Sequence, residues 1–187
     1  PLPAALTGIS TTVKLPDRLN LSLRQAITPQ FDLLGSIEWH NWSRIGVATL
    51  SGPGVALVPA SARAIPFNYR DAWFLALGGE YRWNEFLTVR GGVAYEISPV
   101  TTAVRTTRLP DNDRIWLSAG LSYQVTERIA VNLSYSHVFI KDAPIAIAAP
   151  PYAGTAKASA DIFSVGFRTF WGAAPQGALQ QTAVVRK

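Results

Sequence analysis

The chain has 187 residues, of which 48% are hydrophobic and 16% charged, with a formal net charge of +5 and no cysteine. Average soluble domains carry about 25% charged residues, so this chain is poor in charge, and the lack of cysteine excludes disulfide scaffolds and cysteine-based zinc sites. No stretch approaches the roughly 20 apolar residues of a membrane-spanning helix, and the basic residues are scattered, which argues against a nucleic-acid partner.

Hydrophobic and polar residues alternate with a period of two along most of the chain. In the clearest segment, Trp73, Leu75 and Leu77 alternate with smaller or polar neighbours. This period is typical of strands whose two faces meet different surroundings. The first segment is the weakest, with only Ile9 and Val13 in the apolar positions. The pattern predicts eight strands, near residues 7–15, 19–28, 31–44, 70–83, 86–98, 113–126, 128–141 and 159–171.

The predicted strands are joined by connections that alternate in length. The connections at 28–30, 84–85 and 126–128 are tight turns, whereas the connections at 45–69, 99–112 and 142–158 are long and rich in Pro, Ala and Thr. Short turns at one end and long loops at the other are typical of outer-membrane barrels. The connection at 16–18 breaks this rule, because it is short where a long loop is expected. Residues 172–187 lose the alternation and are predicted to form a tail after a barrel portion at 1–171.

Two features favour a membrane barrel over a soluble one. Aromatic residues lie near both ends of the strands, as in the belts at membrane interfaces. The polar positions mix charged with small residues, which suits a lumen more than a fully solvated face. The sequence therefore predicts a transmembrane antiparallel β-barrel in the bacterial outer membrane, with apolar side chains towards lipid and lipopolysaccharide and polar side chains towards the lumen.

Several segments also carry a family resemblance. The segments are Glu38-Trp39 with Asn41-Trp42-Ser43, Tyr69-Arg70-Asp71-Ala72-Trp73, Arg90-Gly91-Gly92-Val93-Ala94-Tyr95, Leu109-Pro110-Asp111-Asn112-Asp113-Arg114 and Trp116-Leu117-Ser118-Ala119-Gly120. Their order and spacing are more specific than any one of them. On these segments, from Lys14 onward, the chain resembles the C-terminal half of the FadL/TodX family of outer-membrane transporters.

The resemblance implies a 14-stranded barrel with an N-terminal plug, of which this chain would supply the last eight strands. It also implies passive uptake of long-chain fatty acids or other hydrophobic compounds, without a cofactor. A hydrophobic small molecule would be the ligand, and the missing N-terminal barrel half or a second chain would close the sheet.

Charged residues at polar positions are the candidate site residues, because a carboxylate ligand in an apolar pocket needs a cationic partner. We expect Glu80 with Arg82, and Arg90 with Glu96, to form ion pairs in the lumen. Arg105 is a further basic residue at the loop end. The lumen candidates are Arg90, Arg114, Arg168, Glu38, His40, Glu80, Arg82 and Glu96. The candidates at the loop end of the lumen are Arg70, Arg108, Asp111, Asp113 and Lys141.

Two other functions remain as alternatives. Eight strands could close as a small self-contained barrel with a structural or adhesion role. An outer-membrane lipase would place a Ser–His pair on the barrel exterior, and Ser136 with His137 is the pair that could take this role. No nucleophile motif or carboxylate at suitable spacing supports this pair, so we expect no enzyme activity, no catalytic residue and no metal site. The loop at 142–158 is expected either to bind apolar ligand or to cap the barrel.

Overall fold

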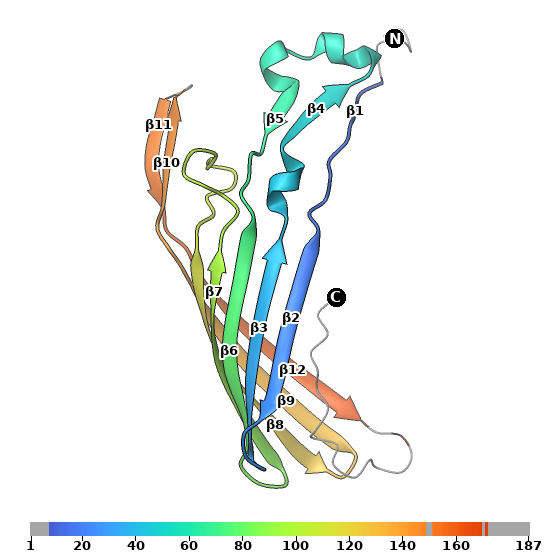
Figure 1. Cartoon of the computed structure of the whole chain (residues 1–187), viewed down its shortest axis with the longest axis vertical. Helices are drawn as coiled ribbons and strands as arrows, with labels where there is room; N and C mark the ends of the chain where they lie inside the picture. Colours follow the sequence, from blue (N-terminus) through green and yellow to red (C-terminus); the bar gives the residue numbers. More distant parts are fainter. Residues whose placement is uncertain (1–7, 149–150, 170, 172–187) are drawn as a thin grey trace.

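The computed structural model describes residues 8–148, 151–169 and 171. A curved antiparallel sheet of seven long strands dominates it (Figure 1). In spatial order the strands are β2 (Arg18–Ala26), β3 (Phe31–His40), β6 (Ala72–Arg82), β7 (Leu87–Ile97), β8 (Arg114–Thr126), β9 (Ile129–Ile140) and β12 (Ser159–Thr169). Each strand pairs with its neighbour in the chain order of long strands, so the sheet is a continuous meander.

These seven strands confirm seven of the eight predicted ones, with most ends shifted by one to three residues. The apolar positions lie on the outward face of the curved sheet, where Leu77, Val93 and Leu117 are each about half exposed. The polar positions lie on the concave face, which includes the buried Glu80 and Thr88. The alternation in the sequence therefore assigned the two faces correctly.

The first predicted strand, 7–15, is not part of this sheet, and this prediction was wrong. Only β1 (Ser10–Thr11) forms there, and it pairs with β4 (Val47–Ser51) in the long connection between β3 and β6. The segment before β2 thus lies at the long-loop end of the molecule. This placement explains the short connection at 16–18, because the described residues before it belong to the long-loop end and not to a strand of the sheet.

Two of the long connections carry further short elements beyond the sheet (Figure 1). The connection between β3 and β6 holds β1's partner β4, which also pairs with β5 (Ala64–Pro66). The connection between β9 and β12 forms a hairpin of β10 (Ala143–Ala148) and β11 (Pro151–Ala156). The 3₁₀ helices are η2 (Trp42–Ile45), η3 (Pro53–Leu57) and η4 (Ala60–Ala62).

The described sheet is open, with β2 and β12 as its edges. Because seven strands alternate in direction, these two edge strands run the same way, both from the long-loop end to the short-turn end. They could therefore meet only as a parallel pair. Among the described residues, no helix is long and apolar enough to cross a membrane.

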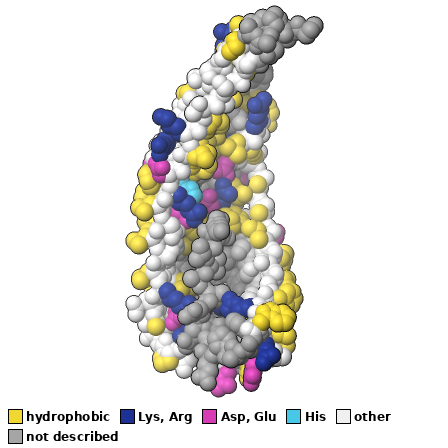
Figure 2. All heavy atoms as spheres, turned by 90° about the vertical axis from the view of Figure 1, so that its right-hand side faces the viewer, with side chains coloured by type: hydrophobic (Ala, Val, Ile, Leu, Met, Phe, Trp, Pro, Cys, Tyr) yellow, Lys and Arg dark blue, Asp and Glu magenta, His cyan; other side chains and the backbone are white. Residues whose placement is uncertain are grey.

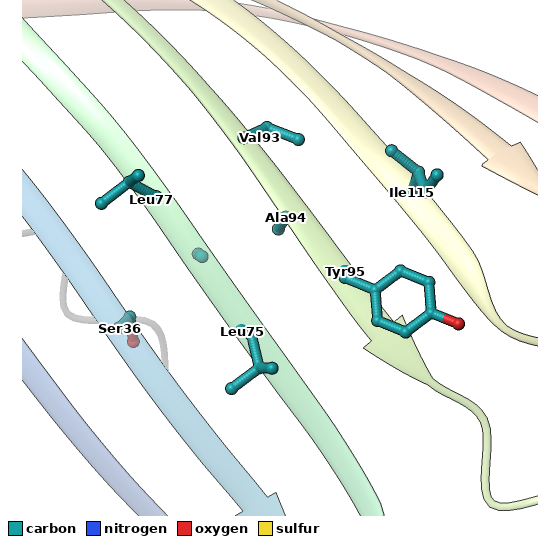
Figure 3. Close-up of a pocket in the computed structure, with 8 residues that line it drawn as sticks. Ser36, Leu75, Leu77, Val93, Ala94, Tyr95 and Ile115 are labelled. Carbon is teal, nitrogen blue, oxygen red and sulfur yellow. The ribbon is translucent and has the colours of Figure 1, made fainter.

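The outward face carries an open groove of about 460 Å³ over β6, β7 and β8. Its side chains, seen in Figure 3, are mainly apolar: Leu75, Leu77 and Val93 lie beside the paired residues Tyr95 and Ile115. A hydrocarbon chain fits such a surface better than a polar group. Ser36, Ala76 and Ala94, which occupy concave positions of the strands, also line it.

Candidate functional site

The candidate site is the concave face of the sheet, where the charged side chains gather. Figure 2 views the molecule from the side of the open edges and shows basic, acidic and histidine side chains between margins rich in hydrophobic ones. Two separate ion-pair networks lie on this face, one at each end of the strands.

The network nearest the short connections, which we call the turn-side network, comprises Arg24, Asp32, Glu80, Arg82 and Arg90. Asp32 and Glu80 are each 3% exposed. Glu80 accepts hydrogen bonds from Arg24 at 2.8 Å and from Arg90 at 2.5 Å. Asp32 accepts bonds from Arg82 at 3.0 and 3.1 Å and a further bond from Arg24. Three cations meet two anions, which leaves a formal charge of +1 on the network.

Strand register explains this network. Glu80 stands directly opposite Asp32 on one side and Arg90 on the other, and side chains in such positions lie about 5 Å apart. Arg90 also donates to the hydroxyl of Ser122 at 2.6 Å. The expected pair of Arg90 with Glu96 is wrong, because the two residues lie on one strand, about 20 Å apart at 3.3 Å per residue.

A second network, the loop-side network, lies towards the long connections. On β2 and β3, Glu38 accepts hydrogen bonds from Arg18 at 2.5 Å and Asn20 at 2.9 Å, and it also contacts His40. His40 is thus a hydrogen-bonded residue of the concave face, as expected from its position.

The loop-side network continues on β7 and β8. Arg114 forms an ion pair with Glu96 at 3.6 Å and another with Asp111. The indole Nε1 of Trp116 donates to Glu96 at 3.0 Å. The Trp116 ring contacts Phe74 edge-on with ring centres 6.4 Å apart, within the range of about 4.5–7 Å that is typical of aromatic pairs. An aromatic pair therefore stands beside the charged groups at this level.

Between the two networks the concave face is lined mainly by small residues, and we call this zone the small-residue zone. Close backbone approach requires glycine at two of its positions: a Cβ at Gly78 would lie 3.0 Å from the Gly91 carbonyl oxygen, and one at Gly92 would lie 3.2 Å from that of Leu77. The zone comprises Ser22, Ser36, Ala76, Gly78, Gly92, Ala94, Ser118 and Ser136, and the larger side chains in the same rows are Leu34, Trp116, Val138 and Ile162.

The long connection between β7 and β8 is fixed to the strand ends by carboxylates. Asp113 accepts hydrogen bonds from Arg70 and from the backbone N–H of Ser98, each at 3.0 Å. Arg105, only 4% exposed, donates to the carbonyl oxygens of Asp111 and Pro144, each at 2.9 Å. The Pro144 contact joins this connection to the β10–β11 hairpin.

The structure brings most of the predicted site residues together, but not all. Arg70, Asp111 and Asp113 meet at the loop end, whereas Lys141 joins them only through its backbone N–H, which donates to the Asp113 carbonyl at 2.9 Å. Arg108 lies exposed in its connection. Arg168 lies on the concave side of edge strand β12.

Sequence reasoning missed Arg18, Arg24 and Asp32 as members of these clusters. A signal was present for Arg24 and Asp32, because both occupy polar positions on either side of the tight turn at 28–30 and are therefore neighbours in a hairpin. The sequence placed Arg105 at the loop end but did not show its burial, which depends on how two long connections fold against each other.

Asp71 fixes the start of the η2 segment at the loop end. Its carboxylate accepts hydrogen bonds from the Ser43 backbone N–H at 3.1 Å and the Trp39 indole at 3.0 Å. Hydrogen bonds from Ser43, and to a smaller extent from Trp39, hold the pKa of the Asp71 carboxyl below its ordinary value of 3.8. Because folding lowers this pKa, the ionised Asp71 carboxylate stabilises the fold at pH values above its ordinary pKa. This stabilisation is lost as the pH falls through the lowered pKa.

We therefore expect the Trp39 indole N–H resonance to titrate with a midpoint below pH 3.8. In Asp71→Asn the titration should vanish, because an amide does not ionise. Two-dimensional NMR of the intact protein in detergent micelles measures this shift. A midpoint at or above the ordinary value would contradict the assigned contacts.

The Ser136–His137 alternative is not supported by the geometry. The Ser136 hydroxyl lies on the concave face, 2.8 Å from that of Ser118, whereas His137 is on the outward face. Asp161 on β12 approaches Nδ1 of His137 at 2.7 Å, a contact between strands that the spacing in the sequence did not show. Among the described residues, no cluster of three or more His, Cys, Asp or Glu side chains could hold a metal ion.

Comparison with known proteins places the chain among outer-membrane proteins. The family model described as "Outer membrane protein transport protein (OMPP1/FadL/TodX)" matches residues 6–171. A long-chain fatty acid transport protein of Escherichia coli O6:H1 is 34% identical over 133 residues, which cover 68% of this chain and 28% of that protein. Outer membrane protein P1 of Haemophilus influenzae is 31% identical over 127 residues, covering 68% of this chain and 27% of that protein.

A solved structure shares the fold. The crystal structure of a Pseudomonas aeruginosa FadL homologue matches with a TM-score of 0.75 at 29% identity, over 86% of this chain and 37% of that one. The chain therefore spans well under half the length of the relatives that it matches.

Proposed function

Because this chain belongs to the OMPP1/FadL/TodX family and lies in the bacterial outer membrane, we propose that it forms one wall of a barrel that takes up long-chain fatty acids or other hydrophobic compounds. The concave face is then the lumen wall, and the long connections are extracellular. The proposed uptake is passive, driven by the concentration gradient of the ligand.

The observation that carries this proposal is the small-residue zone between the two networks. Charged side chains at both ends are held by partners, so they do not fill the middle of the lumen wall. Serine, alanine and glycine there leave space for a ligand that is long and mainly apolar. A barrel whose interior is packed with large side chains would lack this space.

The turn-side network supports a ligand with a carboxylate group. Its three arginines exceed its two carboxylates by one charge, and an anion that leaves water for a partly buried site needs such a partner. Arg90 and Arg114 already have carboxylate partners, so a ligand would share them rather than occupy them alone. A ligand contact by Arg90, Arg114 or Arg168 is part of the proposal.

The alternative of a self-contained eight-stranded barrel is contradicted by the sheet. The described sheet has seven strands, and its edges do not pair with each other. Unpaired edge strands in lipid would leave backbone groups without hydrogen bonds. We propose that the rest of the barrel closes this sheet and supplies the remaining lumen wall.

Two neighbouring residues on opposite faces of β8 test the proposed path. Ser118 lies in the small-residue zone, whereas Ala119 faces outward. We expect Ser118→Trp in the intact protein to reduce uptake of a radiolabelled long-chain fatty acid about tenfold, because the indole would fill the lumen there; a barrier increase of about 1.4 kcal/mol suffices for this.

Ala119→Trp is the matched control and should keep the wild-type rate, because an aromatic ring is tolerated on the lipid side. Both variants must reach the outer membrane at the wild-type level, as shown by immunoblotting. Equal uptake by Ser118→Trp and wild type would contradict a path along this wall.

A further inference from the structure

Arg90 stands at a boundary on the concave face of the sheet. On β6 its row holds the carboxylate of Glu80, and on β3 the same row holds Asp32. On β8, β9 and β12, this row and the next one towards the short turns hold no charged side chain among the described residues. Both carboxylates of the turn-side network therefore lie on one side of Arg90. The side chains on the other side are small or uncharged and polar, and they are Gly120, Ser122, Asn132, Ser134, Ser164 and Gly166.

Hydrogen bonds to both neighbouring strands fix the guanidinium group of Arg90. Its Nε donates to Glu80 on β6 at 2.5 Å, and its Nη1 donates to the Ser122 hydroxyl on β8 at 2.6 Å. Ser122 is only 3% exposed, and its hydroxyl donates in turn to Oδ1 of Asn132 on β9 at 2.5 Å. Because a guanidinium is planar, bonds at two of its nitrogens set the direction of the third.

The described residues leave hydrogen-bonding groups around Arg90 without partners. Nη2 of Arg90 carries two N–H donors, and neither bonds to a residue in the described part of the chain. Thr88, directly opposite Ser122, is fully buried, and within the same residues its hydroxyl has no hydrogen-bond partner. Buried polar groups without a partner are rare and costly. Thr88 and Arg90 lie two residues apart on one face of β7, so a group rich in oxygen atoms can satisfy both.

The charge around Arg90 favours an anion more than the charge around Arg114 does. The turn-side network has three arginines and two carboxylates, which leaves one positive charge. Arg114 is paired with two carboxylates, Glu96 and Asp111, so its positive charge is already outweighed. A carboxylate, with its two acceptor oxygens, matches the N–H donors of a guanidinium. Arg90 is therefore the better partner for an added carboxylate.

Large apolar side chains of the concave face lie on the loop side of Arg90. The Trp116 and Phe74 rings contact each other edge-on, and Val138 stands directly opposite Trp116. Trp116 is also opposite Ala94, four residues from Arg90, which is about 13 Å along the strand at 3.3 Å per residue. A ligand with one charged end and a long apolar chain finds partners for both parts in this direction.

We propose that Arg90 binds the carboxylate of the ligand and that Ser122, held by Asn132, is a positioning residue for the guanidinium. The hydrocarbon chain then extends towards Trp116 and the long connections, so the carboxylate points towards the short turns. The proposed contact rests on the proposed uptake function. It adds to that function the binding residue, its positioning residue and the direction in which the ligand lies.

The test compares two ligands that have the same chain but differ in charge. Binding of radiolabelled palmitate and hexadecanol to the immobilised intact protein in detergent is measured by scintillation proximity at mildly alkaline pH. Losing a hydrogen bond to a charged group weakens binding about tenfold or more. We therefore expect Arg90→Gln to weaken palmitate binding about tenfold and to leave hexadecanol binding unchanged. Trp116→Ala should weaken the binding of both ligands by the same factor.

Variants of Ser122 separate positioning from a structural role. Ser122→Ala keeps the Arg90–Glu80 pair but removes one of the two bonds that fix the guanidinium. We expect it to weaken palmitate binding about fivefold, as for the loss of one neutral hydrogen bond, with hexadecanol binding unchanged. Ser122→Thr keeps a hydroxyl and should bind palmitate as the wild type does. A structural role alone would weaken the binding of both ligands alike.

Arg128→Gln is the matched control, because Arg128 lies exposed in the tight turn at 126–128 and its loss removes the same charge at the same end of the strands. It should bind both ligands as the wild type does. The proposed contact is overturned, and uptake is not, if Arg90→Gln binds palmitate as the wild type does, if it weakens both ligands equally, or if Arg128→Gln loses as much. Should Arg90→Gln fail to fold, the two Ser122 variants decide in the same way. A wild type that binds neither ligand overturns the proposed function, and the contact with it.

Discussion

Replacing Glu80 by alanine should lower the free energy of unfolding of the intact barrel by about 3 kcal/mol. The change leaves Arg24 and Arg90 without the carboxylate that bonds both of them. Breaking a buried ion pair by removing one partner costs about 3–5 kcal/mol. The low end applies because the two arginine side chains are 36% and 28% exposed and remain partly screened by water. Urea-induced unfolding in lipid vesicles, followed by tryptophan fluorescence, measures the effect.

Glu96→Ala is the control for this prediction. Glu96 is 27% exposed and its pair with Arg114 is longer, at 3.6 Å, so we expect a loss of about 1 kcal/mol or less. Glu80→Gln keeps the shape of the side chain and should fall between the two. If Glu80→Ala and Glu96→Ala lose the same amount, the turn-side network is not the stabilising element that its burial indicates.

Replacing Leu77 by arginine should destabilise the barrel by about 2–4 kcal/mol, the amount measured for a basic residue on the lipid face at the bilayer midplane. Leu77 is at the centre of β6, points outward and is 56% exposed. Arginine there would lie in hydrocarbon without a partner. The same unfolding measurement in vesicles gives the value.

Ala76→Arg places the same side chain one residue earlier on the concave face, where water and charged groups can receive it. We expect this variant to lose 1 kcal/mol or less, in keeping with the tolerance of lumen positions. Equal losses at residues 76 and 77 would mean that the outward face is not in lipid.

The long strands could be predicted from the sequence because each has to satisfy two surroundings at once. When apolar and polar residues alternate over ten or more positions, as in β6 and β8, only one assignment of side chains to the two faces of the sheet is possible. Residues 7–15 show the limit of this reasoning. Their weak alternation matches a strand, but only Ser10 and Thr11 form one, and their partner is β4 in a distant connection rather than the barrel sheet. Such pairing is decided by tertiary contacts that local pattern does not contain.

The candidate site was predictable as a set of residues and only in part as a set of pairs: Glu80 lies 3.9 Å from Arg82 as expected, whereas Arg90 pairs with Glu80 and not with Glu96. Position within a strand showed that Glu80, Arg90 and Glu96 share the concave face. Which carboxylate meets which arginine depends on register between strands, and the register across β6 and β7 sets Glu80 opposite Arg90. The His137–Asp161 contact is similar, because β9 and β12 are joined through the whole β10–β11 hairpin.

The odd number of strands in the described sheet bears on how such a barrel could have arisen. A tandem duplication of a unit with an even number of antiparallel strands closes readily, since its first and last strands run in opposite directions. Two copies of this seven-stranded unit, both inserted with their long connections outside, would have to join through parallel edges. A fully antiparallel barrel built on it therefore needs a complement with an odd number of strands that begins and ends in the opposite direction. A design that closes the described sheet with a second copy of itself must therefore add or remove a strand.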